Sequence, residues 1–190
     1  MKTLTAIATV AATLLVTHAP AIDFTPMVAN STADGTPMQR MYFADGNRRI
    51  YYRPPVTWTR AGDAQAVVFT PKDSERGIVK IQNAPAEHSR VAFDERGLDF
   101  FRKVAATLMP PDATQTIETW ETVNPVVLQG WTSFEVGFSY LQSGKVFCRS
   151  VLFINLDANR QIHFIVDSVP AEFQPLYKTA YRTLATWWQQ

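Results

Sequence analysis

The sequence predicts an α+β domain built on a largely antiparallel sheet. Short stretches of alternating apolar and polar residues follow one another with turn residues between them, as in antiparallel strands. Two longer segments, at 89–109 and 170–188, instead repeat apolar residues at helical spacing. The hydrophobic content of 46% is sufficient for a packed core.

Residues 1–21 are typical of a signal peptide. Lys2 is followed by an apolar run of 13 residues, from Leu4 to Val16, whereas a membrane span needs about 20. Ala19 and Ala21 suit cleavage after Ala21. A buried N-terminal helix is the alternative. No cysteine follows that could carry a lipid, so we expect a periplasmic or secreted protein that is soluble after cleavage and has no membrane anchor.

The next segment, residues 22–40, is rich in Thr, Ser, Pro and Ala and shows no apolar periodicity. This composition predicts a flexible linker. A single domain is then expected over residues 41–190. It begins with a hairpin over 41–52 that turns at Asp45-Gly46, and Pro54-Pro55 ends the second strand because proline cannot donate to a ladder.

Two short strands, at 66–70 and 77–82, precede the first helix, which Pro110-Pro111 ends. A strand at 114–122 leads into a meander. The C-terminal helix is expected to present one apolar stripe that includes Trp187 and Trp188.

The meander comprises strands at 131–141, 145–156 and 161–167, joined by turns at 143–144 and 157–160. These turns predict that Gln142 pairs with Lys145, and Leu156 with Gln161. Alternation then predicts one apolar face that a helix covers. It contains Phe134, Val136, Phe138, Tyr140, Phe147, Val151, Phe153, Ile162, Phe164 and Val166. Arg149 falls on this face and therefore needs a carboxylate partner or an edge position.

The opposite face of the meander carries small and polar residues beneath a tryptophan. We interpret four of its members as candidate ligand-binding residues, Trp131, Glu135, Gly137 and His163. The alternative interpretation is a partly solvated face covered by loops or by the second helix.

The order of these elements resembles the PsbP-like family, which includes the extrinsic PsbP subunit of photosystem II and a Ran-binding nuclear import factor of yeast. The likeness rests on the run from Ile50 through Pro54-Pro55 to Trp58, and on the stretch from Arg149 to Glu172-Phe173. The resemblance implies an α/β/α sandwich with an N-terminal hairpin, a central helix and a C-terminal amphipathic helix. It also implies a binding or assembly role in a bacterial exported member.

No catalytic residues, metal ligands or cofactor are expected. In the predicted register Ser150 neighbours Asp167, whereas His163 lies four residues from Asp167 on one strand, about 13 Å away, so a relay of the three is not formed. The single Cys148 is interpreted as a structural thiol. Without Lys2 the chain has 17 basic and 17 acidic residues, which gives no electrostatic reason to expect nucleic acid.

The leading hypothesis is an exported, non-enzymatic binding or assembly module with a protein partner. The second is a carrier of a small hydrophobic or aromatic ligand that uses Trp131 and the small residues around Gly137. The third is a hydrolase in which loops bring Ser150, Glu135 or His163 together.

Overall fold

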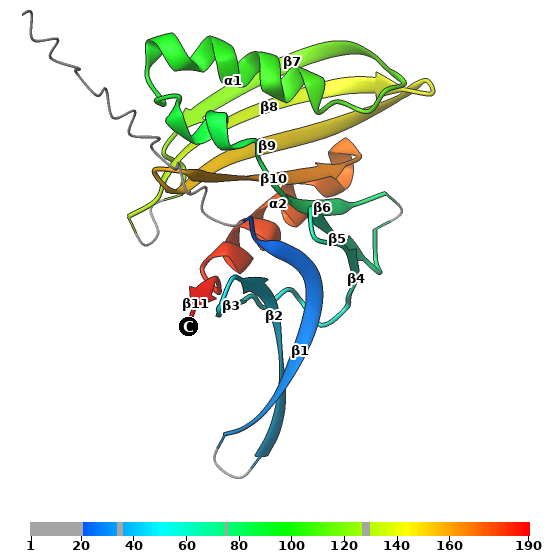
Figure 1. The fold of residues 1–190 in the computed structure, drawn as a ribbon. Helices are drawn as coiled ribbons and strands as arrows, with labels where there is room; N and C mark the ends of the chain where they lie inside the picture. The colour runs from blue at the N-terminus through cyan, green and yellow to red at the C-terminus, as the bar shows by residue number, and fades with distance from the viewer. Residues whose placement is uncertain (1–20, 34–35, 75, 127–129) are drawn as a thin grey trace, which may run out of the picture.

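The computed structural model describes residues 21–33, 36–74, 76–126 and 130–190. Apart from Ala21, the predicted signal peptide lies outside these residues. The described chain forms two antiparallel sheets and two α-helices (Figure 1). No helix within it is long and apolar enough to cross a bilayer.

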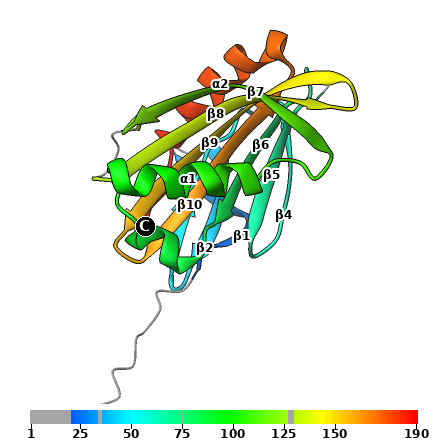
Figure 2. The same cartoon turned by 90° about the horizontal axis from the view of Figure 1, so that it is seen from above.

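The larger sheet has seven strands and carries one helix on each face. Figure 2 looks onto the face that α1 (Glu95–Thr107) crosses, and α2 (Pro170–Leu184) lies on the other side. The Asp94 side chain caps α1 by accepting from the backbone N–H groups of Arg96 and Gly97. A short 3-10 turn, η1 (Ala86–Arg90), precedes α1. The strand order is β4 (Trp58–Gly62), β5 (Ala66–Pro71), β6 (Ile78–Asn83), β10 (Arg160–Ser168), β9 (Lys145–Asp157), β8 (Thr132–Gln142) and β7 (Ala113–Val123).

The smaller sheet has four strands, and half of it comes from the segment that was expected to be a linker. Its order is β1 (Asp23–Ala33), β2 (Thr36–Asp45), β3 (Arg48–Tyr51) and β11 (Trp188–Gln189). The flexible linker predicted over 22–40 is therefore wrong, because β1 and β2 pair along a long hairpin that projects from the body of the molecule (Figure 1). The expected hairpin over 41–52 is present, as β2 paired with β3.

The α/β/α sandwich is also wrong as a fold class. Strands far outnumber helices, and the four-stranded sheet shares the α2 side of the large sheet, so the fold is β-rich. The expectation failed because the polar segment at 22–40 forms strands, and because the chain after α2 returns to a sheet.

After α2 the chain returns to the small sheet, which the sequence did not predict. Helix α2 stops at Leu184, so Trp187 and Trp188 do not belong to its apolar stripe. Trp187 is buried at the centre of the aromatic core between the sheets, next to Phe24, Phe43, Tyr52 and Trp131. Trp188 lies in β11 and is half exposed.

The register of β10 differs by one residue from the predicted one. Arg160 pairs with Asp157, but a shift then places Gln161 opposite Asn155 rather than Leu156. A slip of one residue exchanges the two faces of a strand. Ile162, Phe164 and Val166 consequently pack in the core beneath α2, whereas the remaining apolar residues of the predicted face pack beneath α1.

This register supplies the carboxylate that Arg149 requires. Asp167 lies opposite Arg149 and accepts from its Nε at 2.5 Å, and the Tyr140 hydroxyl donates to the same carboxylate at 2.8 Å. Burial raises the pKa of Asp167, and the guanidinium opposes that rise. Arg149 also donates to the carbonyl of Leu108 at the end of α1. The buried pair thus joins α1 to β9 and β10.

We expect Trp187→Ala to lower the free energy of unfolding by about 3–5 kcal/mol, because a large cavity opens where the two sheets meet. Thermal and denaturant unfolding measure the change. Trp188→Phe, at the neighbouring exposed position, is the matched control and costs under about 1 kcal/mol. Equal effects at the two positions would contradict this packing.

Arg149→Ala should cost about 3–5 kcal/mol, because it leaves the Asp167 carboxylate buried without its cation. The comparison is Arg102→Ala, which removes exposed ion pairs with Asp99 and Glu121 and should cost no more than about 1 kcal/mol. Chemical denaturation at neutral pH distinguishes the two, and a similar small loss in both would show that the buried pair does not stabilise the fold.

Candidate binding site

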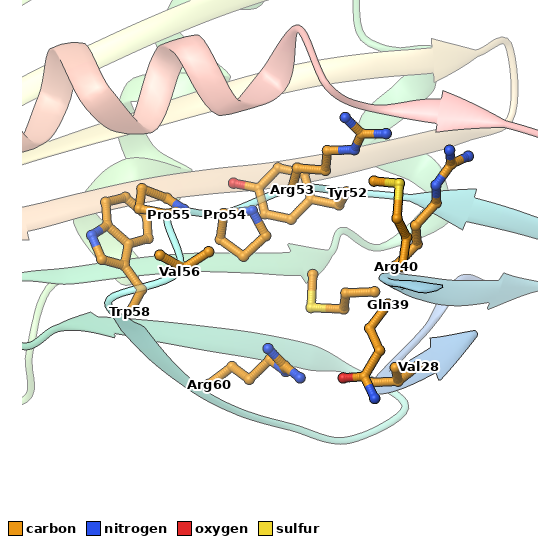
Figure 3. A pocket seen from close by; sticks show the side chains of 12 residues that line it. Val28, Gln39, Arg40, Tyr52, Arg53, Pro54, Pro55, Val56, Trp58 and Arg60 are labelled. Atoms are coloured by element: carbon orange, nitrogen blue, oxygen red, sulfur yellow. The ribbon is translucent and has the colours of Figure 1, made fainter. Parts of the chain in front are cut away.

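An open groove lies where β3 ends and the chain crosses from the small sheet to β4. Pro54 and Pro55 end β3, and a turn in which the Trp58 N–H donates to the Pro55 carbonyl at 3.0 Å leads into β4. The groove has a volume of about 390 Å³ (Figure 3). Its walls are Val28, Met38, Gln39, Arg40, Met41, Tyr52, Arg53, Pro54, Pro55, Val56, Trp58 and Arg60. We call it the arginine groove.

The floor of the arginine groove is apolar and firmly held. Met41, Tyr52 and Trp58 are buried, and the Tyr52 ring packs against Phe69 at 5.4 Å. The Tyr52 hydroxyl forms a buried hydrogen bond with Thr183 of α2. Burial raises the pKa of Tyr52, so the hydroxyl stays protonated.

The rim is cationic. Arg40, Arg53 and Arg60 line the groove, no carboxylate does, and none of the three forms an ion pair within the described chain. The Nε atom of Arg40 is buried and has no hydrogen-bond partner among the described residues. In Figure 3 the Arg60 side chain comes from the wall opposite Arg40 and Arg53.

Apolar side chains stand exposed beside these arginines. Val56, directly after Pro54-Pro55, is 99% exposed, and Val28 and Met38 of the hairpin are also exposed. Guanidinium groups bind carboxylates and phosphates in a bidentate manner. The combination suits an anionic ligand that also has apolar groups.

The predicted ligand-binding residues do not form one site. Trp131, Glu135 and Gly137 lie on the α2 side of the large sheet, whereas the register shift places His163 on the α1 side. The expectation that His163 shares a face with the other three is therefore wrong. Whether any of them binds a ligand stays a prediction.

The space at Gly137 is filled from within the chain. Trp120 of β7 pairs with Gly137, and a Cβ atom at Gly137 would lie 1.8 Å from the Trp120 ring. The same indole packs edge-on against Phe173 of α2 at 5.9 Å. The Trp120 ring therefore covers Gly137, one of the small residues that the carrier hypothesis assigns to the ligand.

Glu135 is 1% exposed and is held by two hydroxyl groups. Ser150 donates to one carboxylate oxygen at 2.6 Å, and Tyr177 of α2 donates to the other at 3.0 Å. Burial raises the pKa of Tyr177 to about 12, which keeps it a donor at neutral pH. Ser150 lies opposite Val166 rather than Asp167, as the register shift requires. The hydrolase hypothesis needs His163 beside this cluster, but the sheet separates them.

His163 instead stacks on His88 of η1, with ring centroids 5.6 Å apart. Gln82 contacts its Nδ1 atom at 3.3 Å, while its Nε2 atom and His88 Nδ1 are buried without a partner in the described chain. The pairing of His88 with His163 was not predicted from the sequence. Within the described residues, no group of three or more His, Cys, Asp or Glu side chains is arranged to hold a metal ion.

The arginine groove was missed for a related reason. One of its walls belongs to β1 and β2, which were interpreted as a linker, so Arg40 had no predicted neighbours. The available signal was the exposed run Arg53-Pro54-Pro55-Val56, which carries a cation and apolar groups together.

Comparison with known proteins gives only distant matches. No protein family and no curated protein matches the sequence. Among solved structures, a protein of unknown function, PA94 from Pseudomonas aeruginosa, has a TM-score of 0.44 at 11% identity, covering 82% of this chain and 94% of its own. LpqN, involved in cell envelope biogenesis of Mycobacterium tuberculosis, has a TM-score of 0.45 at 12% identity, covering 87% and 90%. At this similarity neither role transfers, and the PsbP-like resemblance stays a prediction.

The environment of His163 predicts a dependence of stability on pH. Burial, then the nearby His88 and Lys80, lower the pKa of His163 to about 3, against about 6.5 when unfolded. Between about pH 3 and pH 6.5 the unfolded chain binds more protons at this position than the folded chain. The contribution of His163 to the free energy of unfolding is therefore complete above about pH 6.5 and declines as the pH falls toward 3. Titration of His163 should therefore lower the free energy of unfolding by about 2 kcal/mol between pH 7 and pH 5.

The measurement compares unfolding free energies of the wild type and His163→Gln at pH 7 and pH 5. The variant should lose less stability than the wild type over this interval, because glutamine does not titrate. Identical losses would show that His163 is not the responsible group.

Proposed function

We propose that this chain is an exported, non-enzymatic binding or assembly module, and that the arginine groove takes an acidic segment of its protein partner. The observation that carries the proposal is that three arginines, Arg40, Arg53 and Arg60, line a groove with an apolar floor and without a carboxylate among its lining residues. Charges of one sign in a concave site attract and orient a partner of the opposite sign.

The edge of β2 supports an extended segment as the occupant. β3 pairs with β2 only over Tyr42–Asp45, with one further bond from the Tyr52 N–H to the Met41 carbonyl. Beyond it, Met38 and Gln39 have no strand partner on that side among the described residues. An extended peptide can add to such an edge through main-chain hydrogen bonds while alternate side chains enter the groove.

A binding role without catalysis is supported by how the hydroxyl and carboxyl groups are used. Ser150 and Tyr177 are donors to Glu135 beneath α2, and the Arg149–Asp167 pair joins α1 to the sheet. These contacts hold the fold together on opposite faces of the sheet. A hydrolase would require several of these groups around one substrate.

A synthetic peptide of alternating Val and Glu tests the proposal, because it offers carboxylates on one side of an extended chain. Fluorescence anisotropy with the mature protein should detect binding that weakens as salt is added. Arg60→Glu should reduce the affinity at least about tenfold, since it places a repelling charge in the groove. Arg96→Glu, an exposed position at the start of α1, is the matched control and should leave binding unchanged.

The peptide with Gln in place of Glu separates charge from edge pairing. It should bind weakly if the arginines provide most of the recognition. Equal binding of the two peptides, or binding that survives Arg60→Glu, would exclude the groove as an acidic-segment site. A photoreactive side chain at Val56, compared with one at Arg96, then identifies the natural partner, which should cross-link at Val56 through a segment rich in Asp or Glu.

A further inference from the structure

The outer face of the small sheet carries a row of three aromatic rings. Tyr42 of β2 pairs with Tyr51 of β3, which pairs with Trp188 of β11, so the three side chains are direct cross-strand neighbours. The Tyr42 and Tyr51 rings are 6.0 Å apart, and those of Tyr51 and Trp188 are stacked 5.5 Å apart at an interplanar angle of 28°. We call this the aromatic row.

The hydrophobic core does not use this row. The residues that follow Tyr42 and Tyr51, and the one that precedes Trp188, point to the opposite side and are buried: Phe43, Tyr52 and Trp187. Trp188 is 49% exposed, and both tyrosines are partly exposed. Cross-strand aromatic contacts stabilise the pairing of β11 with β3, and Trp188, in the edge strand of the sheet, has no described strand neighbour on its other side.

An arginine completes the surface. The Arg49 guanidinium lies 4.9 Å from the centre of the Tyr42 ring, is exposed, and forms no ion pair with a described carboxylate. On the same face, Asp23 is two strands away and pairs with Ala44, and one of its carboxylate oxygens accepts from the Thr25 N–H. The Arg49 side chain also hydrogen-bonds the Tyr51 side chain, and its main chain pairs with that of Gln190 at 2.9 and 3.0 Å. The guanidinium is thus held at the surface beside the aromatic row.

We propose that the aromatic row and Arg49 bind an acidic polysaccharide. Pyranose rings present flat faces of C–H groups, which carry a small positive charge and pack well on the electron-rich face of Trp188 that Tyr51 does not cover. A uronic-acid carboxylate on a neighbouring sugar reaches Arg49 and accepts two hydrogen bonds from its planar guanidinium. This proposal goes beyond the acidic-segment function and does not use Arg60, which belongs to the large sheet.

Charge favours a polysaccharide over single-stranded nucleic acid, whose bases also stack on aromatic rings. A nucleic acid carries a phosphate at every residue and is followed by a basic stripe in proteins that bind it. Arg49 contacts the aromatic row, Arg40 lies two residues from Tyr42 on the same face of β2, and basic and acidic residues balance at 17 each after Lys2. An acidic glycan with its charges farther apart matches this surface better.

The test is isothermal titration of the mature protein with oligogalacturonate, with a neutral cello-oligosaccharide of equal length, and with oligothymidylate. Oligogalacturonate should bind most tightly and the neutral sugar measurably less. Trp188→Ala should weaken oligogalacturonate binding about tenfold or more, whereas Trp188→Phe, which keeps a ring, should restore most of it.

Charge is tested by Arg49→Gln, which should weaken the binding of oligogalacturonate but not that of the neutral sugar. Arg96→Gln is the matched control. Arg60→Glu should leave the sugar affinities unchanged, so failure of the groove and failure of the aromatic row are distinguishable. If neither sugar binds, if Trp188→Ala binds as well as the wild type, or if oligothymidylate binds best, the polysaccharide assignment is overturned. Unfolding curves of Trp188→Ala confirm that any loss is not a loss of fold.

Discussion

The one-residue shift between β9 and β10 decides how both faces of the large sheet are built. Because of it, Asp167 faces Arg149 and Tyr140 beneath α1, and Ile162 and Phe164 pack beneath α2. Without the shift, Arg149 would be buried without its anion, which is among the most costly arrangements in a protein interior. The irregularity is therefore a requirement of the fold, as β-bulges are where they redirect a side chain.

Periodicity and turn residues predicted most elements of the large sheet and both helices, but not this shift. The strands at 131–141, 145–156 and 161–167 match β8, β9 and β10 closely, and the turn at Ser143-Gly144 gave the correct pairing of β8 with β9. The second turn contains four residues that suit more than one turn length. Successive residues of a strand point to opposite faces of the sheet. An error of one residue in the turn length therefore put every side chain of β10, including His163, on the wrong face.

The small sheet and its sites were harder to predict for a different reason. The strands β1 and β2 draw many of their residues from Ser, Thr, Asn and Gln, and much of their length is an exposed hairpin with little core to impose an apolar alternation. The residues of β1 and β2 therefore resemble those of a flexible linker in composition. The groove and the aromatic row both depend on residues brought together only when this hairpin meets β3, β4 and β11.

The alternation of adjacent residues in the small sheet links its stability to its surface. Trp187 fixes the end of the chain in the core. Its neighbour Trp188 consequently points to the outer face of the sheet, where it stacks on Tyr51. On the groove side, Tyr52 is fixed through Thr183, and the backbone N–H of its neighbour Arg53 donates to the Thr186 side-chain hydroxyl at 2.9 Å. Each exposed group is thus positioned by a buried neighbour. Rigid presentation of this kind lowers the entropy that a ligand must overcome on binding, which is why the core beneath these surfaces matters to recognition as well as to folding.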